Sequence, residues 1–460
     1  MAHDAAHYQG LVDAAMAPHR WIGCADAASP FTTLVNHLAE IGAPRPLVLA
    51  GTPGTGTLPT PDAAELILLD TTADTMLGGI RAYHAALRHL PEWVIDRIAS
   101  WDPDRTARVL ATFLDTEMEI AGRRSWGARP EAWLRLEDKL GNDAVWEAAG
   151  IPHVDSEVVP AASSELVAAA RRLDRGDGTV WTGDDREGWN GGAEYLRIVA
   201  DPEDAQEAVR FFAAHCHHVR VMPFLPGVAC SIHGTVFPDV VAAFRPVEMI
   251  VFRTPGSNRF TYAGVGTTWD PTPAVREEMR SAVRRVGAHL RDAFEYRGTF
   301  TMDGIATPEG WRPTELNPRF GADLGAIGRS SGMPLLGITR MLIAGEAVGG
   351  LDPAEIEQVS LEAGDRVRQL GGQMMITTRV SATRDQRIEL ADGAIAPVPE
   401  GGNGLLQLGP ATMGGLVRLA MDPGAVPGGT HGAPIVRAAF AAADALWGTG
   451  IGPLIPVTPA

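Results

Sequence analysis

The part of the sequence that most restricts the fold is residues 296–321, which read YRGTFTMDGIATPEGWRPTELNPRFG. Two stretches of strand-like composition flank the Pro-Glu-Gly turn at 308–310. Proline suits the first corner of a type I turn, and glycine suits the left-handed residue that closes a three-residue loop with a bulge. We therefore predict a β-hairpin in which Thr307 pairs with Trp311.

The same register brings two carboxylates together on one face of the hairpin. Asp303 lies directly opposite Glu315, with a Cβ separation of about 4.5–5.5 Å. Two carboxylates this close repel each other unless a cation lies between them or one is protonated. Because side chains alternate along a strand, Asn317 and Arg319 share the face of Glu315. Carboxylate and amide oxygens suit Mg²⁺, and the arginine can hold an anion. The alternative is a polar face that only meets water.

Several motifs resemble those of the ATP-grasp superfamily of carboxylate–amine ligases. ELNPRFG (315–321) resembles its E-x-N-P-R metal strand, and TMDGI (301–305) resembles the strand that supplies the other metal carboxylate. Further similar segments are EDKL (137–140), AAGIP (148–152), the Gly-rich GDDREGWNGGAEY (183–195) and the hinge strand RVMPFLPGVACSI (220–232). The resemblance covers about residues 136–330, in the family's order.

Lys139 is the only lysine in a chain with 39 basic residues. Arginine in place of lysine, with many Ala, Gly and Pro, is typical of GC-rich coding, so the one lysine that remains is informative. We expect it on a helix that Gly150 ends, because Pro152 prevents continuation. The resemblance implies that its ammonium contacts an ATP phosphate, where the wider guanidinium of arginine is a poor substitute. The alternative is an ordinary helix lysine.

The resemblance assigns roles to these motifs. It implies that Asp303, Glu315 and Asn317 are metal ligands and that Lys139 and Arg319 are catalytic. It further implies that the nucleotide is bound by Lys139, Arg186, Gly188, Gly191, Gly192, Val221, Met222, Phe224 and Leu225. The implied cofactors are ATP and Mg²⁺, for which Mn²⁺ can substitute.

The sequence departs from the family pattern in the nucleotide-binding region. No lysine stands on the predicted strand at 179–182, so backbone N–H groups of the Gly-rich loop, helped by Arg186, take over more of the phosphate binding. Met222 stands where many members have an acidic residue. Adenine recognition would then rest on backbone groups and on the apolar walls of Val221, Met222 and Phe224.

Three acidic residues in the Gly-rich loop, Asp184, Asp185 and Glu187, are unexpected beside phosphate. One interpretation is that they receive a cationic amine substrate.

The hydrophobic patterns predict an α/β fold that begins with a small N-terminal domain. With the division that the resemblance implies, the predicted parts are a small N-terminal α/β domain (1–135), an ATP-grasp lid subdomain with the Gly-rich loop (136–222), a core subdomain with the metal hairpin (223–350) and a C-terminal extension packing on the core (351–460). The N-terminal domain should contain buried strands near 45–57 and 64–70 and a helix at 74–91. The lid should contain strands at 157–161, 178–182, 193–199 and 218–224 and helices at 163–173 and 202–214. A long helix at 274–296 precedes the hairpin. In the extension we predict one clear strand (373–380) and a terminal helix (433–447).

The composition excludes some classes of partner. There are 56 acidic and 39 basic residues, and the resulting net charge of −17 disfavours nucleic acids and anionic membranes. Three scattered cysteines fit a reducing compartment, and the N-terminus shows no signal-peptide pattern. We therefore expect a cytoplasmic protein whose partners are small amino acids or peptides, and a homodimer stays open.

The resemblance implies an ADP-forming acid–amino-acid ligase, which joins a carboxylate of an amino acid or peptide to an amine through an acyl phosphate. Some similarity to the pheganomycin-type peptide ligases favours a role in specialised metabolism. The alternatives are an ATP-grasp enzyme of carboxylase or purine-pathway type and a non-catalytic nucleotide-binding protein.

Other motifs carry weaker signals. The candidates for binding a substrate carboxylate are Arg245, Arg253, Arg259 and Arg329. The segment HCHH (215–218) alternates faces and lacks a distant partner pair, so we interpret it as structural and not as a metal site. The Gly-rich turn at 51–57 matches neither a P-loop nor G-x-G-x-x-G and is interpreted as a turn or a substrate-lining loop.

Overall fold

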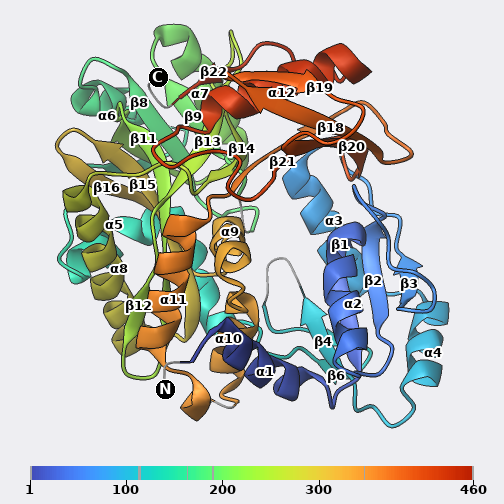
Figure 1. Cartoon of the computed structure of the whole chain (residues 1–460). Coiled ribbons are helices and arrows are strands. Elements are labelled where there is room, and N and C mark those ends of the chain that lie inside the picture. Colours follow the sequence, from blue (N-terminus) through green and yellow to red (C-terminus); the bar gives the residue numbers. More distant parts are fainter. Residues whose placement is uncertain (1–2, 112–115, 163, 189–190, 347, 458–460) are drawn as a thin grey trace.

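The computed structural model describes residues 3–111, 116–162, 164–188, 191–346 and 348–457. Within these ranges the chain forms three large sheets and one short strand pair, β5 (Glu119–Ile120) with β6 (Arg123–Arg124). Figure 1 shows the N-terminal sheet set beside the larger core, with the C-terminal strands above the N-terminal sheet and beside the upper part of the core. No helix in these ranges combines the length and the apolar character that crossing a membrane requires.

The N-terminal domain is a parallel sheet covered by helices. Its strands, in the order β3-β2-β1-β4, are β1 (Trp21–Ala27), β2 (Leu47–Thr52), β3 (Glu65–Leu68) and β4 (Arg108–Ala111). Its helices are α1 (Ala5–Met16), η1 (Ser29–Phe31), α2 (Thr32–Glu40), α3 (Met76–Arg88) and α4 (Glu92–Trp101). β2, β3 and α3 confirm the predicted elements of this region. β2 is buried along its whole length, which is typical of a parallel strand covered on both faces.

The lid is an antiparallel sheet with two helices packed on one face. The sheet order is β7-β10-β8-β9, formed by β7 (Glu157–Pro160), β8 (Thr179–Gly183), β9 (Leu196–Val199) and β10 (His218–Pro223). The helices are α6 (Glu165–Leu173) and α7 (Pro202–His215), and the segment before them contains η2 (Glu131–Glu137), η3 (Lys139–Gly141) and α5 (Asn142–Ala148). The predicted strands and helices of the lid are confirmed, with small differences at their ends.

A twelve-stranded sheet runs from the hairpin through the core into the C-terminal segment. Ten of its strands follow the order β16-β15-β11-β13-β14-β17-β21-β20-β18-β19. Outside this order, β12 pairs with β11 and β22 pairs with β13. Its core strands are β11 (Val228–Val236), β12 (Val241–Ala243), β13 (Val247–Arg253), β14 (Phe260–Gly266), β15 (Gly298–Thr307) and β16 (Gly310–Asn317). The C-terminal strands are β17 (Leu370–Ile376), β18 (Arg384–Ala391), β19 (Ala394–Pro397), β20 (Gly404–Ala411), β21 (Gly414–Met421) and β22 (Ile455–Pro456). The helices are α8 (Pro273–Phe294), α9 (Ala322–Ser331), α10 (Leu335–Ala344), η4 (Val348–Gly350), α11 (Pro353–Arg366) and α12 (Ala433–Trp447).

The prediction of a single clear strand in the C-terminal segment is wrong. Five antiparallel strands, in the order β17-β21-β20-β18-β19, form this part of the sheet, and α12 covers one of its faces. The predicted strand at 373–380 overlaps β17, but it begins late and extends past the end of that strand. β18 with β19 and β20 with β21 form hairpins closed by two-residue loops. Asp392-Gly393 between β18 and β19 is a hairpin turn signal that the prediction did not use.

In the hairpin, the predicted pairing of Asp303 with Glu315 is confirmed but the predicted loop is wrong. Thr307 pairs with Gly310 and not with Trp311, so the loop has two residues instead of three. A two-residue loop shifts the register by one residue, which alone would have separated the two carboxylates.

A β-bulge restores the register on the way to the carboxylates. It lies between Asp303 and Gly304, where Thr314 is the extra residue of β16. The neighbouring Pro313 has no N–H to donate to the ladder, which favours an irregularity at this point. The bulge also leaves the carbonyl of Thr314 free to accept a hydrogen bond from Arg220 of the lid, at 3.0 Å.

Gly264 allows β14 and β17 to approach closely, and this contact connects the core to the C-terminal strands. Its φ is +145°, and a Cβ would lie 2.1 Å from the carbonyl oxygen of Gly371. We expect Gly264→Ala to lower the free energy of unfolding by about 3 kcal/mol or more, because backbone strain and overlap with the neighbouring strand add.

Gly256→Ala is the matched control for that substitution. Gly256 also has a positive φ, +71°, but nothing lies within 4 Å of a Cβ there, so the expected loss is about 1 kcal/mol. Urea denaturation followed by far-UV circular dichroism measures both variants. Equal losses would contradict the importance of the β14–β17 contact.

Candidate functional site

The side chains at the end of β16 converge on one cation, the ammonium of Lys139. Its Nζ lies 2.8 Å from Glu315 Oε1 and donates to Asn317 Oδ1 at 3.1 Å and to the carbonyl of Leu316 at 3.2 Å. The Lys139 side chain is 5% exposed, whereas that of Glu315 is 31% exposed. The one lysine of the chain is therefore buried against two of the predicted metal ligands. Its contact with an ATP phosphate stays a prediction.

Lys139 lies in a helical segment, as predicted, but its own turn is a 3₁₀ helix and not part of the α-helix. It lies in the short turn η3, and the helix α5, which ends just before Gly150, begins three residues later. The Asp138 side chain accepts a hydrogen bond from the backbone two residues on, at 3.1 Å. Asn142 accepts one from the backbone of β16, at 3.3 Å. Such side-chain bonds to backbone groups compete with regular helix formation.

Asp303 faces the same cluster from β15. Its carboxylate accepts hydrogen bonds from Ser231 Oγ at 2.6 Å and from Asn317 Nδ2 at 2.8 Å. Burial, followed by the charge of Glu315, raises the pKa of Asp303 to about 7. Burial acts on Glu315 in the same direction, but the Lys139 ammonium outweighs it and the pKa of Glu315 is lowered. Without a further cation, the pair therefore resists carrying two full negative charges at neutral pH.

The sequence patterns did not identify a third carboxylate of the site, Asp323. It lies in the first turn of α9, where it is buried and accepts a hydrogen bond from the Tyr262 hydroxyl at 2.9 Å. Burial raises the pKa of Asp323 to about 6, and its charge contributes to the raised pKa of Asp303. The one signal in the sequence is its place four residues after Arg319, where the chain turns back from the hairpin into a helix.

Arg319 is oriented by a buried chain of charges that the sequence analysis also missed. Its Nη1 lies 2.5 Å from Glu137 Oε2. The other oxygen of Glu137 lies 2.7 Å from Arg129, which also donates to the carbonyl of Pro318 at 2.8 Å. Burial alone would raise the pKa of Glu137, but the two arginines and Lys139 lower it to about 2. Glu137 is therefore ionised and holds Arg319 beside the cluster.

These residues fit a Mg²⁺ ion. The oxygens of Glu315 and Asn317 already converge on a positive charge. Burial, followed by the charge of Glu315, raises the pKa of Asp303, and another cation would favour its ionised form. Mg²⁺ takes few protein oxygens and completes its shell with phosphate and water. The metal-ligand roles of Asp303, Glu315 and Asn317 stay predictions.

The residues predicted to contact adenine lie on β10 and directly after it. Val221 is fully buried and packs in the lid core with Trp181, so the prediction that its side chain forms an adenine wall is wrong. Because side chains alternate, Met222 points to the opposite face of the sheet, together with Arg220.

The two predicted contacts that follow β10 are half-buried side chains, Phe224 and Leu225. The backbone N–H of Phe224 already donates to the carbonyl of Gly178, at 2.9 Å. The apolar side chains of Met222, Phe224 and Leu225 therefore stay the candidates for contact with a base.

Two acidic residues of the Gly-rich loop have partners within the lid. Asp184 accepts hydrogen bonds from the backbone N–H groups of His217 at 2.9 Å and His218 at 2.6 Å. Glu187 accepts one from the Tyr195 hydroxyl at 2.6 Å. Both carboxylates fix the base of the loop, so a cationic amine substrate is not needed to explain them. Asp185 is exposed.

The Gly-rich loop rests against helix α3 of the N-terminal domain. Arg81 of α3 lies 3.6 Å from Glu187 and donates to the carbonyl of Gly188 at 3.4 Å. A Cβ at Gly192 would lie 1.9 Å from the terminal methyl of Met76. This loop is therefore packed between the lid and the N-terminal domain.

The predicted phosphate-binding glycines lie in this loop with Arg186. Gly188 and Gly192 have φ values of +87° and +63°, which only glycine adopts without cost. Gly191 accepts a backbone hydrogen bond from Glu194 at 3.3 Å, and Arg186 is exposed. Residues 189–190, between these glycines, lie outside the described ranges.

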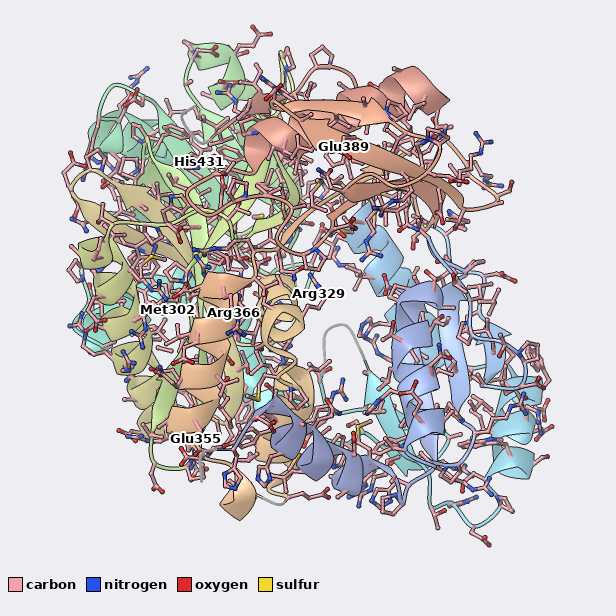
Figure 2. The ribbon with its side chains drawn as sticks, viewed as in Figure 1. Met302, Arg329, Glu355, Arg366, Glu389 and His431 are labelled. Atoms are coloured by element: carbon pink, nitrogen blue, oxygen red, sulfur yellow. The ribbon has the colours of Figure 1, made fainter. Side chains whose placement is uncertain are left out.

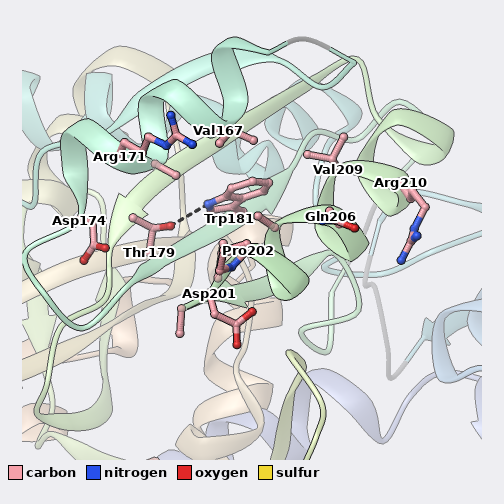
Figure 3. A pocket seen from close by; sticks show the side chains of 14 residues that line it. Val167, Arg171, Asp174, Thr179, Trp181, Asp201, Pro202, Gln206, Val209 and Arg210 are labelled. Atoms are coloured by element: carbon pink, nitrogen blue, oxygen red, sulfur yellow. Dashed lines mark hydrogen bonds between the residues drawn. The ribbon is translucent and has the colours of Figure 1, made fainter.

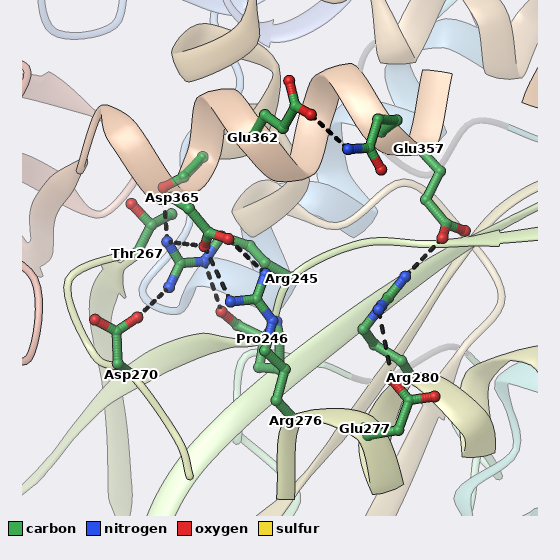
Figure 4. Close-up of polar contacts among 12 residues, drawn as sticks. Arg245, Pro246, Thr267, Asp270, Arg276, Glu277, Arg280, Glu357, Glu362 and Asp365 are labelled. Carbon is green, nitrogen blue, oxygen red and sulfur yellow. Dashed lines mark hydrogen bonds and ion pairs between the residues drawn. The ribbon is translucent and has the colours of Figure 1, made fainter. Parts of the chain in front are cut away.

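Arg245, one of the four candidates for binding a substrate carboxylate, has a structural role. Arg245 is buried and lies 2.9 Å from Asp270 and 3.3 Å from Asp365 (Figure 4). It also donates to the carbonyls of Gly364 at 2.6 Å and Trp269 at 3.2 Å. These partners occupy its donors, so Arg245 links α11 to the loop before α8.

The other three predicted arginines lie apart from one another. Arg253 is half-buried at the end of β13, where β22 pairs with it. Arg259 is exposed in the loop that follows, and Arg329 is exposed on α9.

Two sequence motifs have structural roles. The Gly-rich turn at 51–57 contacts the C-terminal segment: Thr55 donates to the carbonyl of Pro410, and Gly56 donates to Thr383, each at 3.0 Å. The HCHH segment supplies the backbone groups that hold Asp184.

In the part of the chain that the structure describes, no three His, Cys, Asp or Glu side chains are arranged to hold a metal ion.

A pocket of about 690 Å³ lies on the outer side of the lid, between α6 and α7 (Figure 3). Trp181, Val167 and Val209 line it. It lies on the helix side of the lid sheet, opposite to Met222, and contains none of the predicted site residues. The pocket is therefore separate from the carboxylate cluster.

Solved structures share this fold over most of the chain. An ADP complex of purK, N5-carboxyaminoimidazole ribonucleotide synthetase, has a TM-score of 0.51 at 12% identity, covering 93% of this chain and 96% of that chain. Pyruvate carboxylase from Rhizobium etli has a TM-score of 0.53 at 14% identity, covering 87% of this chain and 37% of that chain. An L-amino acid ligase from Bacillus licheniformis has a TM-score of 0.49 at 12% identity, covering 88% of this chain and 93% of that chain. No protein-family model and no curated protein matches the sequence.

The raised pKa of Asp303 predicts how stability depends on pH without metal and nucleotide. The folded protein binds this proton more tightly than the unfolded chain, whose aspartates titrate near about 3.9. The stabilisation is therefore complete at low pH and is lost as the pH rises through about 7. In Asp303→Asn this group does not titrate, so the variant does not lose this stabilisation as the pH rises. The free energy of unfolding of the variant minus that of wild type should therefore rise between about pH 4 and about pH 8. The rise should be at most about 1.4 kcal/mol per unit of pKa shift.

Urea denaturation at a series of pH values measures this slope. A constant offset from the altered hydrogen bonds to Ser231 and Asn317 does not affect it. Asp385→Asn, at an exposed aspartate of β18, is the control and should follow wild type. A pH dependence of Asp303→Asn parallel to that of wild type would count against the pKa shift.

The ammonium of Lys139 predicts competition with a metal ion. In Lys139→Met the aliphatic stem stays, but Glu315 loses its cation, so without metal the variant should be less stable by about 1–3 kcal/mol. Added Mg²⁺ should raise the melting temperature of this variant more than that of wild type, because no ammonium competes for the same oxygens.

Thermal melts with EDTA and with Mg²⁺ test this competition. The double variant Lys139→Met with Glu315→Gln is the control, because it removes the carboxylate as well. It should recover stability in EDTA and lose the response to Mg²⁺. A magnesium effect of the same size in all three proteins would refute the competition.

Proposed function

On the basis of the ATP-grasp fold of this chain, we propose that it is an ATP-dependent ligase that joins the carboxylate of an amino acid or peptide to an amine. The observation that carries the proposal is the cluster at the end of the hairpin. There Asp303, Glu315 and Asn317 bring hard oxygens together beside Lys139 and Arg319. Oxygens for a divalent cation beside cations for phosphate are what a reaction on ATP requires.

The proposed reaction has two steps. The substrate carboxylate first takes the terminal phosphoryl group of ATP, which gives an acyl phosphate and ADP. The amine nitrogen then forms a bond to the acyl carbon, the bond from that carbon to the phosphate oxygen breaks, and the phosphate leaves with the electron pair and the proton lost by nitrogen. Mg²⁺, when bound, neutralises phosphate oxygens.

The protein's part in this reaction is to position groups and to supply positive charge. Asp303, Glu315 and Asn317 would hold the metal ion. Lys139 and Arg319 would offset charge on the phosphate, and fixed charges of this kind act strongly because they need no reorganisation during the reaction. Glu137, anchored by Arg129, keeps Arg319 in place.

The contact between the Gly-rich loop and α3 supports protection of the acyl phosphate. Water would hydrolyse this intermediate, so a loop that covers it favours transfer to the amine. In the structure the loop is held by Arg81 at Glu187 and at the carbonyl of Gly188. The N-terminal domain would thereby help to close the site.

The second candidate is an enzyme of the carboxylase or purine-pathway type, in which bicarbonate is the carboxylate. It is favoured by the names of the two solved structures whose TM-scores exceed 0.5, a purK synthetase and a pyruvate carboxylase. Lys139 is the only lysine, so the chain itself carries no separate lysine for biotin. A non-catalytic nucleotide-binding protein is a third possibility, against which the complete cluster argues.

An array of amino acids, with and without bicarbonate, separates these functions. The proposed ligase releases ADP and phosphate only with a productive acid and amine, and mass spectrometry then identifies the amide. ADP release that depends on bicarbonate and gives no amide would favour the second candidate. Nucleotide binding without ADP release under any condition would favour the third.

Glu315→Ala should abolish ADP release, because it removes one of the two carboxylates predicted to bind the metal. Removing one preorganised hydrogen-bond donor lowers kcat by about 10²–10³. We expect the loss of this carboxylate to lower the rate of ADP release by at least about 10². Glu309→Ala, in the exposed loop of the same hairpin, is the control and should keep wild-type activity. Wild-type turnover by Glu315→Ala with an intact fold would refute the assignment.

A further inference from the structure

Two polar side chains beside the carboxylate cluster, His233 of β11 and Thr301 of β15, are buried without a hydrogen-bond partner. His233 is fully buried, and Thr301 is 3% exposed. Within the described ranges, neither the two ring nitrogens of His233 nor the hydroxyl of Thr301 forms a hydrogen bond. Folded proteins rarely leave buried polar groups unpaired, so such groups indicate a bound ligand or an ordered water.

The register of the sheet places both side chains next to the cluster. His233 pairs with Thr301 across β11 and β15, and Thr301 pairs with Asn317 across β15 and β16. Residues opposite each other in a ladder share a face, with a Cβ separation of about 4.5–5.5 Å. Asp303, two residues after Thr301, shares this face, whereas Met302 between them packs in the apolar core on the opposite face, together with side chains of α8 (Figure 2). This polar row therefore runs beside the row of carboxylates.

Both unpaired side chains point to one spot at Gly321, where α9 begins. A Cβ on Gly321 would lie 2.6 Å from Thr301 Oγ1 and 3.2 Å from His233 Nε2. The φ of Gly321 is −81°, which any residue adopts, so space and not backbone conformation favours glycine here. Gly321 is partly exposed. His233, Thr301 and Gly321 thus form a polar subsite that no side chain of residue 321 fills.

The charges around this polar subsite favour an uncharged ligand. Burial alone lowers the pKa of His233 to about 3, so the ring is neutral and offers one donor and one acceptor. The N-terminus of α9 favours negative charge, but Asp323 in its first turn already supplies it. A neutral imidazole and a hydroxyl can each donate and accept. Hydroxyl and carboxamide groups do the same, and they match the subsite better than an anion or an ammonium does.

We propose that His233 and Thr301 bind a hydroxyl or carboxamide group on the side chain of the acid substrate. The proposal rests on the ligase function proposed above and names the class of its acid, an amino acid or peptide whose reacting residue has such a side chain. The reacting carboxylate would lie beside the row of carboxylates, one ladder step or about 5 Å away, which a short polar side chain spans. The acid is selected, and not the amine, because the subsite adjoins the groups predicted to hold metal and phosphate.

Steady-state kinetics with acids of matched shape test the proposal. The pairs are threonine with valine, asparagine with leucine and glutamine with methionine, each as a free amino acid and as the C-terminal residue of an alanyl dipeptide. In at least one pair, the kcat/KM of the polar acid should exceed that of its partner by at least about 100-fold, because the apolar acid leaves buried polar groups unpaired. This ratio should fall by about 10-fold or more in Thr301→Val.

Thr299→Val is the matched control, on the same face of the same strand. Thr299 is buried, and its hydroxyl bonds those of Thr235 at 3.0 Å and Thr339 at 2.5 Å. Its loss should lower the melting temperature and leave the ratio unchanged. Thr301→Val removes a hydroxyl that has no partner in the described ranges, so without substrate its melting temperature should stay the same or rise. If Thr301→Val keeps the wild-type ratio, or is destabilised as much as the control, the proposal is wrong.

Calorimetry separates failure of this proposal from failure of the ligase function. The chain with ADP and Mg²⁺ is titrated with the same acids in the absence of an amine. Preferential binding of a polar acid that both Thr301→Val and His233→Leu lose supports the subsite even if no amide is ever formed. Equal binding of the two members of every pair, or binding of none of these acids, would overturn the proposal. A preference that appears only when the same pairs are varied as the amine would overturn it as well.

Discussion

The candidate site depends on the repulsion between two neighbouring carboxylates, which only a positive charge offsets. Asp303 and Glu315 are placed opposite each other by the β15–β16 ladder, and neither can move away without breaking that ladder. The Lys139 ammonium, 2.8 Å from Glu315, meets the need of one of them, while the pKa of Asp303 is raised to about 7. A site that is incompletely neutralised in the bare protein favours a further cation, and a divalent ion bound to a polyphosphate brings one.

Separate parts of the chain meet at β16. Arg220 of the lid donates to the carbonyl of Thr314, and Arg129, from the segment before the lid, donates to the carbonyl of Pro318. Lys139 bonds the carbonyl of Leu316 between them. Each of these long basic side chains is buried and ends on a backbone oxygen of the same short segment. The position of β16 relative to the lid is therefore set by charged hydrogen bonds and not by apolar packing alone.

The sequence predicted the pairing of the two carboxylates correctly, but it predicted the wrong loop length and no bulge. The assumed three-residue loop gave the right register near Asp303, whereas the structure reaches it with a two-residue loop and a bulge at Thr314. The two irregularities compensate, and neither is visible in strand alternation. Val221 was misassigned for a similar reason, since a buried hinge strand has apolar residues on both faces, and only the position of Trp181 and the lid helices shows which face is the core.

The sequence by itself determined the local features of this protein: the hairpin, the pairing of its acids, the order of the lid elements and the singular lysine. These follow from turn chemistry and from periodicity over a few residues. Only the tertiary structure decided which distant groups join them, namely Asp323 with Tyr262 and Glu137 between its two arginines. The physical reason is that a charged side chain is expensive to bury unless it meets a partner, and that partner is selected by how the sheets and helices pack, which no short stretch of sequence records.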